Sequence, residues 1–259
     1  MKREILGTPE RTGDEEMEER VPVCVTEECA PGKYESEKER TDMTLSERQQ
    51  EILEELMERY PVLQAVRQPI LDAYEMLESC YARGGKLLIA GNGGSCADAE
   101  HIVGELMKGF VKRRPLAPEL QEAMCAEDED HGALLARSLQ GGLPAIALNG
   151  HPGLSTAFAN DVDADMMFAQ QLCGYGVAGD VFLGISTSGN SKNVDYAVTV
   201  AKAKGLKVLG LTGKDGGKLG RRADVAVIVP EMETFKIQEL HLPVYHALCL
   251  LLEERFFEK

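Results

Sequence analysis

The stretch that decides the fold runs from Leu88 to Leu106 and reads Leu-Ile-Ala-Gly-Asn-Gly-Gly-Ser-Cys-Ala-Asp-Ala-Glu-His-Ile-Val-Gly-Glu-Leu. The apolar residues 87–90 predict a buried strand, and the glycines of 91–94 allow a tight turn with close backbone approach. We expect Ser95 or Asp98 to cap the helix that follows. Because such a helix start presents unpaired N–H groups and the positive end of the helix dipole, the turn predicts a binding site for phosphate.

This turn matches neither common nucleotide-binding motif. A P-loop ends in Gly-Lys-Ser/Thr, and the dinucleotide motif is spaced Gly-x-Gly-x-x-Gly, whereas the chain reads Gly91-Asn-Gly-Gly-Ser95. Taken alone, it is equally typical of an ordinary strand-to-helix loop. Ile185-Ser-Thr-Ser-Gly-Asn-Ser191 ends another apolar run before a helical pattern. Its hydroxyls predict a second cradle, suited to a small phosphate ester, although a serine-rich helix cap is the alternative.

Composition narrows the class of protein. The chain has 259 residues, an apolar fraction of 44% and a net charge of −15. This length suits one domain with a tail, and the acidic balance argues against a nucleic-acid-binding surface. No apolar run is long enough for a membrane span, and the acidic N-terminal stretch has no signal-peptide core. The seven cysteines are irregularly spaced, which favours free thiols and a cytoplasmic location.

The order of elements along the chain predicts an α/β fold. Residues 1–42 are charged and poor in apolar side chains, which predicts a flexible acidic tail ahead of a domain over 43–259. Leu45–Arg83 has helical periodicity that breaks near Pro61. Apolar runs then alternate with helical patterns, as in a parallel sheet covered by helices. The expected strands are Lys86–Ala90, Pro144–Leu148, Asp180–Ser186, Lys207–Thr212 and Val225–Val229, and the expected helices are Ala97–Phe110, Met166–Gly174, Asn190–Lys204 and Phe235–Phe257.

An insertion interrupts this alternation at about residues 115–142. It contains a predicted helix over Glu119–Cys125, the acidic run Glu127–Asp130 and a further helical stretch to Gln140. Its apolar positions need a surface to cover, so we expect a lid over the cleft or a subunit contact. A solvated surface excursion is the alternative.

Two pairs of polar residues lie on predicted helices near these cradles. His101 and Glu105 are four residues apart and therefore share one helical face. Gln238 and His246 lie on the last predicted helix. A His and a carboxylate beside a phosphate-binding cleft can act as acid and base or as metal ligands. Each residue alone is more often structural.

Four motifs in the same order resemble the sedoheptulose-7-phosphate isomerases of the sugar-isomerase (SIS) domain family. They are Gly91-Asn-Gly-Gly-Ser95, Ile185-Ser-Thr-Ser-Gly-Asn-Ser191, Leu211-Thr-Gly-Lys-Asp-Gly-Gly217 and Ile237-Gln-Glu-Leu-His241. The resemblance runs from about Leu45 to the C-terminus. It implies an SIS-type three-layer sandwich with a five-stranded parallel sheet, a homotetramer, and conversion of sedoheptulose 7-phosphate to D-glycero-D-manno-heptose 7-phosphate in heptose biosynthesis.

The resemblance also implies roles for individual residues. The family's general base matches Glu105, and its second acid/base residue matches His246. Its metal site, filled by zinc in some members, matches His101, Glu105, Gln238 and His246. Gln238 also belongs to the residues that match the family's substrate contacts. These are Asn92, Gly93, Gly94, Asn160, Asp161, Ser186, Thr187, Ser188, Ser191 and Gln238.

A second hypothesis is a non-catalytic SIS protein that binds a phosphosugar or a protein partner. Such an adaptor is expected to lose the base or the distal histidine, and this chain keeps both Glu105 and His246. The sequence therefore favours an aldose–ketose isomerase.

Overall fold

A computed structural model describes residues 45–257, so the predicted tail over residues 1–42 lies outside the described residues. Five parallel strands form one sheet in the order β2-β1-β3-β4-β5. The prediction of a five-stranded parallel sheet flanked by helices is therefore confirmed. The strands are β1 (Leu87–Gly91), β2 (Ala145–Ala147), β3 (Val181–Ser186), β4 (Lys207–Thr212) and β5 (Val225–Ile228).

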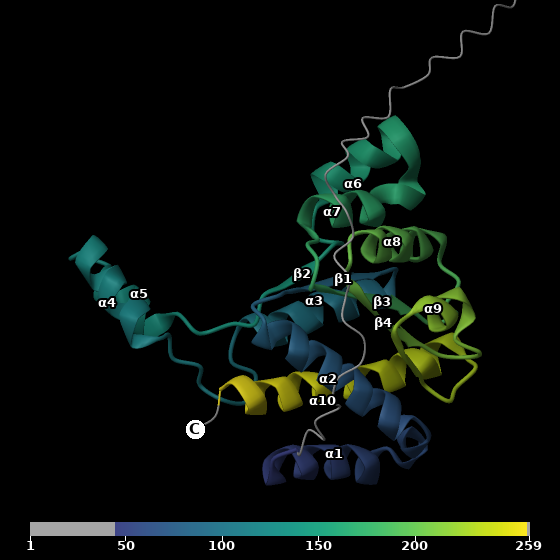
Figure 1. Cartoon of the computed structure of the whole chain (residues 1–259), viewed down its shortest axis with the longest axis horizontal. Coiled ribbons are helices and arrows are strands. Elements are labelled where there is room, and N and C mark those ends of the chain that lie inside the picture. The colour runs from purple at the N-terminus through teal and green to yellow at the C-terminus, as the bar shows by residue number, and fades with distance from the viewer. Residues whose placement is uncertain (1–44, 258–259) are drawn as a thin grey trace, which may run out of the picture. The chain divides into compact units, whose positions relative to one another are not determined.

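Helices cover both faces of the sheet because side chains alternate along each strand (Figure 1). Leu87 and Ile89 of β1 point into a large core, and Leu88 and Ala90 point into a smaller one on the other face. The large core contains residues of α1 (Glu47–Arg59), the 3-10 helix Pro61–Val66, α2 (Arg67–Ala82), α3 (Gly94–Met107) and α10 (Thr234–Phe256). The smaller core contains residues of α7 (Met167–Tyr175), α8 (Lys192–Ala203) and α9 (Gly217–Arg222).

The N-terminal helices break where the sequence predicts. Ser46 caps α1 in a capping box with Gln49, and the short 3-10 helix that begins at Pro61 separates α1 from α2. Gln49 is buried, and its Nε2 donates to Tyr74 Oη at 2.6 Å and to the Leu251 carbonyl at 3.1 Å. One side chain thereby ties α1 to α2 and α10.

The helix α3 differs from its predicted bounds at both ends. It begins at Gly94 rather than Ala97, and Gly93 precedes it with φ +57°, a conformation that glycine adopts readily. Ser95 and Asp98 therefore lie inside the helix, and neither caps it. The helix ends at Met107, short of the predicted Phe110.

The remaining helical segments lie in the connections between these elements. α4 (Pro118–Glu127) and α5 (Gly132–Ser138) occupy the predicted helical stretches of the insertion. α6 (Pro152–Phe158) was not predicted, nor was the short α9. A π-helical turn, Ala159–Asp163, and a 3-10 turn, Ala164–Met166, join α6 to α7.

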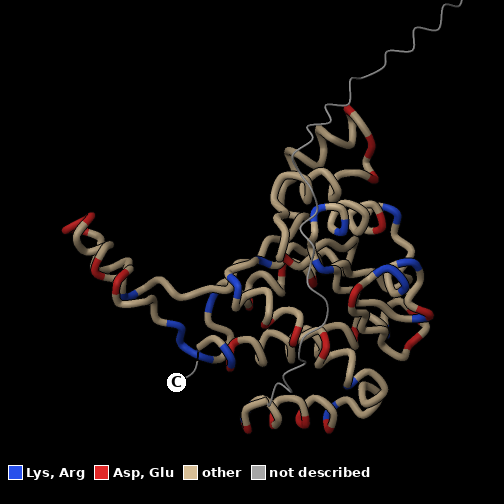
Figure 2. Tube along the Cα trace, viewed as in Figure 1, with Lys and Arg blue, Asp and Glu red and all other residues tan. Residues whose placement is uncertain are grey.

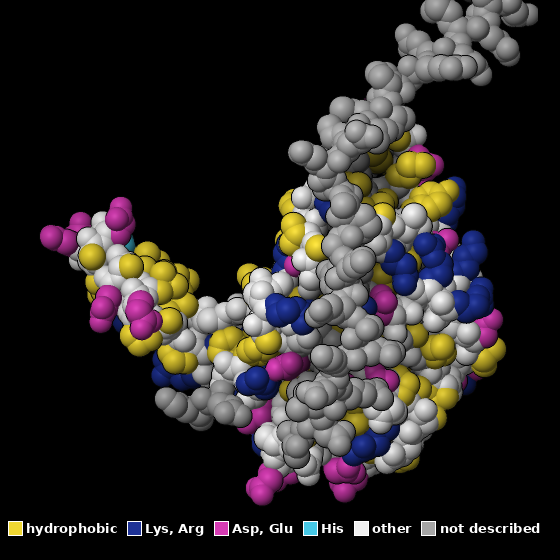
Figure 3. Space-filling view, in the orientation of Figure 1, with side chains coloured by type: hydrophobic (Ala, Val, Ile, Leu, Met, Phe, Trp, Pro, Cys, Tyr) yellow, Lys and Arg dark blue, Asp and Glu magenta, His cyan; other side chains and the backbone are white. Residues whose placement is uncertain are grey.

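The helices α4 and α5 pack against each other and form an arm that extends away from the sheet layers (Figure 1). The arm closes at its base, where Pro115 and Gln140 form an antiparallel bridge and the Gly141 N–H donates to the Arg114 carbonyl at 2.7 Å. Basic positions gather at this base and acidic ones at the far end (Figure 2). Hydrophobic side chains lie on the surface of the arm (Figure 3), and the exposed ones include Leu120, Leu134, Leu135 and Leu139.

We expect residues 117–139 to be replaceable by a short Gly-Ser linker without unfolding the domain. The bridge at the base already brings the two ends of the arm together, and α4 has no buried residue. If the arm is a lid or a subunit contact, its loss lowers turnover or changes the assembly. Turnover and sedimentation that both stay unchanged would instead make the arm a solvated surface excursion.

A buried histidine makes the stability of the domain depend on pH. His241 on α10 is fully buried, and neither ring nitrogen has a hydrogen-bond partner among residues 45–257. Burial lowers the pKa of His241 from 6.5 to about 4. The nearby Thr212 backbone raises this pKa by a smaller amount. Since the unfolded chain then binds the proton more readily, stability is intact above about pH 6.5 and is lost progressively as the pH falls from there to about 4.

The substitution His241→Leu is therefore expected to remove about 3 kcal/mol of the fall in unfolding free energy between neutral pH and pH 4. Urea titrations at several pH values measure this slope. His131→Leu is the control, because the His131 side chain is 69% exposed. Equal slopes for the wild type and His241→Leu would contradict the assignment.

Candidate active site

The switch point of the sheet lies between β1 and β3, because the chain leaves β1 toward β2 on one side and returns to β3 on the other. Gly91 at the end of β1 pairs with Ile185 near the end of β3. The glycine-rich turn and the serine-rich loop therefore lie side by side. Ligands of open α/β sheets bind at such a point, beyond the carboxyl ends of the strands.

Direct hydrogen bonds join the glycine-rich turn to the first turn of α8 and to the segment after β2. The side-chain amides of Asn92 and Asn193 bond each other reciprocally, at 2.9 Å in each direction. Asn149 Nδ2 donates to the Gly91 carbonyl at 2.7 Å and holds the start of the glycine-rich turn. A Cβ added at Gly94 would collide with the side-chain amide of Gln238, so this glycine lets α10 approach the turn.

The geometry of both loops suits an anionic ligand. Neither α3 nor α8 has a side-chain cap hydrogen bond at its N-terminus, and an uncapped helix start attracts negative charge. Ser186 Oγ lies 2.9 Å from Ser191 Oγ. Ser188 Oγ accepts from the Asn190 N–H at 3.2 Å. The predicted phosphate contacts Ser186, Thr187, Ser188 and Ser191 therefore lie between the end of β3 and the first residue of α8.

A second group of predicted residues meets where α3 lies against α10. His101 Nε2 lies 3.3 Å from Glu105 Oε1 and 3.4 Å from His246 Nε2. Lys108 Nζ lies 3.0 Å from Glu105 Oε2, and the ring of Phe110 lies 5.3 Å from that of His246. The predicted base and the predicted second acid/base residue are therefore brought together around His101.

The surroundings of His246 keep its ring neutral. Burial and the neighbouring His101 lower its pKa, Glu105 raises it, and Arg59 adds a smaller lowering effect. A neutral imidazole can both accept and donate a proton, as movement of a proton between two hydroxyl oxygens requires.

The four predicted metal ligands do not form one cluster. His101, Glu105 and His246 meet, whereas Gln238 lies against Gly94 at the glycine-rich turn. Two imidazoles and a carboxylate are donor types that zinc accepts, and donors bound to one zinc ion lie about 3.4 Å apart. Within residues 45–257, however, no three or more His, Cys, Asp or Glu side chains are arranged to hold a metal ion.

Asn160 and Asp161 lie apart from both groups, in the π-helical turn after α6. Asn160 Nδ2 donates to Asp161 Oδ1 at 2.8 Å, and within residues 45–257 neither side chain bonds a predicted site residue outside this turn. The nearby ion pair of Asp165 with Lys192, at 2.8 Å, ties this segment to the start of α8.

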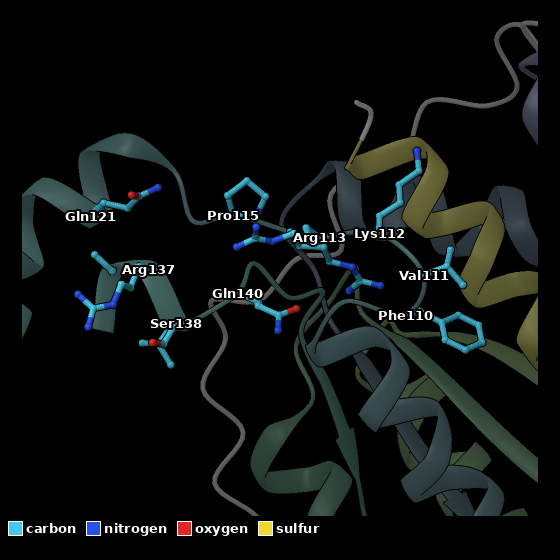
Figure 4. A pocket seen from close by; sticks show the side chains of 12 residues that line it. Phe110, Val111, Lys112, Arg113, Pro115, Gln121, Arg137, Ser138 and Gln140 are labelled. Carbon is cyan, nitrogen blue, oxygen red and sulfur yellow. The ribbon is translucent and has the colours of Figure 1, made fainter. Parts of the chain in front are cut away.

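Two surface pockets flank these elements. A pocket of about 290 Å³ between α1 and α10 contains His246 together with Arg59 and Glu55. A larger one, of about 400 Å³, lies at the base of the arm and contains no predicted catalytic residue (Figure 4). Arg113 and Arg137 line it from the two sides of the arm.

Several residues of the site were missed by the sequence reasoning. Lys108 lies three residues after Glu105 on the same face, and Asp98 lies three residues before His101, so helical spacing could have found both. Tyr245 is the neighbour of His246 in the sequence. Asn193 gives no sequence signal, because its contact with Asn92 depends on how the start of α8 packs against the distant glycine-rich turn.

Comparison with known sequences identifies the family. Two SIS domain family models match the chain, one over residues 51–140 and the other over residues 153–251. The phosphoheptose isomerase of Aneurinibacillus thermoaerophilus is 41% identical over 177 residues, which cover 68% of this chain and 76% of that protein. The phosphoheptose isomerase of Thermodesulfovibrio yellowstonii is 41% identical over 189 residues, covering 73% of this chain and 81% of that one.

Solved structures agree with this assignment. The phosphoheptose isomerase of Neisseria gonorrhoeae has a TM-score of 0.61 at 33% identity, covering 82% of this chain and all of that one. The enzyme of Francisella tularensis has a TM-score of 0.62 at 29% identity, covering 80% of this chain and 97% of that one. The chain therefore belongs to the phosphoheptose isomerase family of SIS-domain proteins.

Proposed function

We propose that the chain is an aldose–ketose isomerase that converts sedoheptulose 7-phosphate to D-glycero-D-manno-heptose 7-phosphate. The observation that carries this proposal is the meeting of Glu105, His101 and His246 between α3 and α10. The same helix α3 begins at the phosphate-type turn after β1. The helix α3 therefore begins at the glycine-rich turn and carries the candidate base, Glu105, near its other end.

The reaction needs a base and a group that moves a hydroxyl proton. Glu105 removes a proton from C1 of the ketose while His246 donates a proton to the C2 carbonyl oxygen, which gives an enediol. Glu105 then returns its proton to C2, and His246 takes up the proton of the hydroxyl on C1, which leaves an aldehyde at C1. No electron is gained or lost overall, so no redox partner is required.

Incubation of the purified full chain with sedoheptulose 7-phosphate tests this function. C5 and C6 ketose phosphates serve as comparison substrates. We expect the aldose to form from the C7 substrate at the highest kcat/KM. Binding of all three esters without conversion would favour the alternative, a non-catalytic phosphosugar-binding protein.

We also propose zinc as a cofactor, with His101, Glu105 and His246 as ligands once these side chains turn toward one common point. The support is the donor set and its two spacings of 3.3 and 3.4 Å. Zinc at this position would polarise the substrate oxygens. Addition of Gln238 as a fourth ligand requires its side chain to move from Gly94. Treatment with a chelator, followed by zinc analysis and activity measurement with added metals, tests this proposal.

The assembly and location of the protein are proposals as well. We propose a homotetramer, which sedimentation of the purified chain tests. Within residues 45–257 no helix combines the length and hydrophobicity needed to span a membrane. The five cysteines of this region are free thiols, which supports a cytoplasmic location.

If the loop 186–191 holds the phosphate, Ser188→Ala weakens binding of the phosphorylated substrate. We expect a loss of about 1–3 kcal/mol, the range for one hydrogen bond to a charged group. Binding of the dephosphorylated sugar should change far less. Ser138→Ala on the arm is the matched control, and equal losses for both sugars would move the phosphate elsewhere.

A further inference from the structure

A buried tyrosine hydroxyl joins the active-site histidine to a carboxylate that the proposed reaction does not use. Tyr245 on α10 is 2% exposed. Its Oη lies 2.9 Å from His101 Nδ1 and donates to Asp98 Oδ1 at 3.3 Å. Asp98 and His101 lie on one face of α3. The two hydrogen bonds of Tyr245 therefore connect α10 to α3 at two points.

The protons in this chain can be assigned from hydrogen-bonding chemistry. A phenol has one proton, and an ionised carboxylate only accepts. When Tyr245 donates to Asp98, the tyrosine oxygen must accept from His101, which places a proton on Nδ1 of that ring. We propose that Tyr245 is a positioning residue that holds this proton on His101 Nδ1 and directs Nε2 at the reacting groups. This role rests on the proposed isomerase function.

The direction of Nε2 matters because of what it faces. Without a proton, His101 Nε2 can accept from His246 Nε2, which lies 3.4 Å away. Glu105 Oε1, 3.3 Å away, is also an acceptor, so the two atoms together face the space of a cation or a substrate hydroxyl. The His101 side chain is 41% exposed, so packing alone leaves its ring free to turn. The hydrogen bond from Nδ1 and the edge-to-face contact with Tyr245, at 5.5 Å between ring centroids, fix its orientation.

A purely structural role explains these groups poorly. Asp98 Oδ2 is buried and has no hydrogen-bond partner among the described residues. A buried polar atom without a partner costs about 1–3 kcal/mol, so an apolar residue at position 98 would suit the fold better. A role in orienting the hydroxyl of Tyr245 accounts for a carboxylate at position 98.

The test is the variant Tyr245→Phe in the full chain, which removes one oxygen and keeps the ring. Partners that orient a reactive or metal-binding His typically contribute about 10–100-fold to activity. We expect kcat to fall by that factor, with KM within about twofold because the buried Tyr245 acts through His101. Nitrogen NMR of histidine-labelled protein, assigned with His101→Asn, should show the Nδ1–H form in the wild type and a mixture of tautomers in Tyr245→Phe.

Tyr74→Phe is the matched control. Tyr74 is also fully buried, and its Oη accepts one hydrogen bond, from Gln49 Nε2. We expect a similar loss of stability in both variants, but kcat and the His101 tautomer should change only in Tyr245→Phe. An Nε2–H tautomer in the wild type, or an unchanged kcat in Tyr245→Phe, would overturn the proposal. If the wild type isomerises no ketose phosphate, the proposed function fails, and the NMR spectra still decide the positioning role.

Discussion

Replacing Glu105 with Gln is expected to lower kcat by about 10²–10⁴-fold, the contribution typical of a positioned general base. The amide is nearly isosteric with the carboxylate, so the fold should be unchanged, but it cannot accept the C1 proton. Glu105 also accepts from Lys108 Nζ at 3.0 Å and lies 3.3 Å from His101 Nε2. Turnover of sedoheptulose 7-phosphate and uptake of deuterium from heavy water into the substrate measure the loss.

Glu100→Gln is the matched control for this prediction. Glu100 lies on the same helix but is exposed, so the same chemical change there should leave kcat unaltered. Deuterium uptake separates two explanations of a slow variant, because it requires removal of the C1 proton but not completion of the reaction. If Glu105→Gln keeps kcat within about tenfold of the wild type, Glu105 is not the general base.

The sheet could be predicted because each strand is a continuous apolar run bounded by turn residues. Such runs are typical of strands buried on both faces, and Leu87–Ala90 and Val181–Ile185 are buried throughout. The two cradles follow strands that turn out to be neighbours. Helix ends were less predictable, since the start of α3 depends on the positive φ of Gly93.

The contacts that complete the site depend on tertiary packing. His101 and Glu105 could be paired from their spacing on one helix. The link through Tyr245 needs α10 to lie against α3, and the sequence does not specify which faces meet. Gln238 was predicted to join this group, yet its side chain lies against Gly94.

The burial of Arg114 is the clearest example of a contact that the sequence does not reveal. Arg114 lies in the basic run 112–114, and such a run favours a solvent-exposed surface. Its side chain is fully buried, and Nε lies 2.8 Å from Glu253 Oε1, which is also buried. Burial raises the pKa of Glu253, but hydrogen bonds from Phe110, Val111 and Arg114 outweigh it and hold the pKa below its ordinary value. The pair is therefore ionised.

We expect Arg114→Met to lower the free energy of unfolding by about 3–5 kcal/mol, the usual result of removing one partner of a buried ion pair. The charge of Glu253 then stays buried without its partner. The guanidinium also donates to the Leu106 carbonyl at 2.7 Å and to the Glu105 carbonyl at 3.0 Å. A cation at the end of α3 is favourable, so its loss also loosens the turn that carries the candidate base.

Removal of both charges should not restore stability. Glu253 accepts the backbone N–H groups of Phe110, Val111 and Lys112, at 2.8, 3.0 and 3.1 Å. The double variant Arg114→Met/Glu253→Leu would leave these three partly buried donors without their acceptor, and each lost hydrogen bond costs about 0.5–1.5 kcal/mol. We therefore expect the double variant to be at least as unstable as Arg114→Met.

Urea unfolding at neutral pH measures these losses, with Arg67→Met as the control. Arg67 Nη2 lies 2.6 Å from Glu54 Oε1, and both side chains are exposed, at 38% and 57%. An exposed pair of this kind contributes about 0–1 kcal/mol. If Arg114→Met and Arg67→Met lost the same stability, the buried pair would not be what holds the end of α3 against α10.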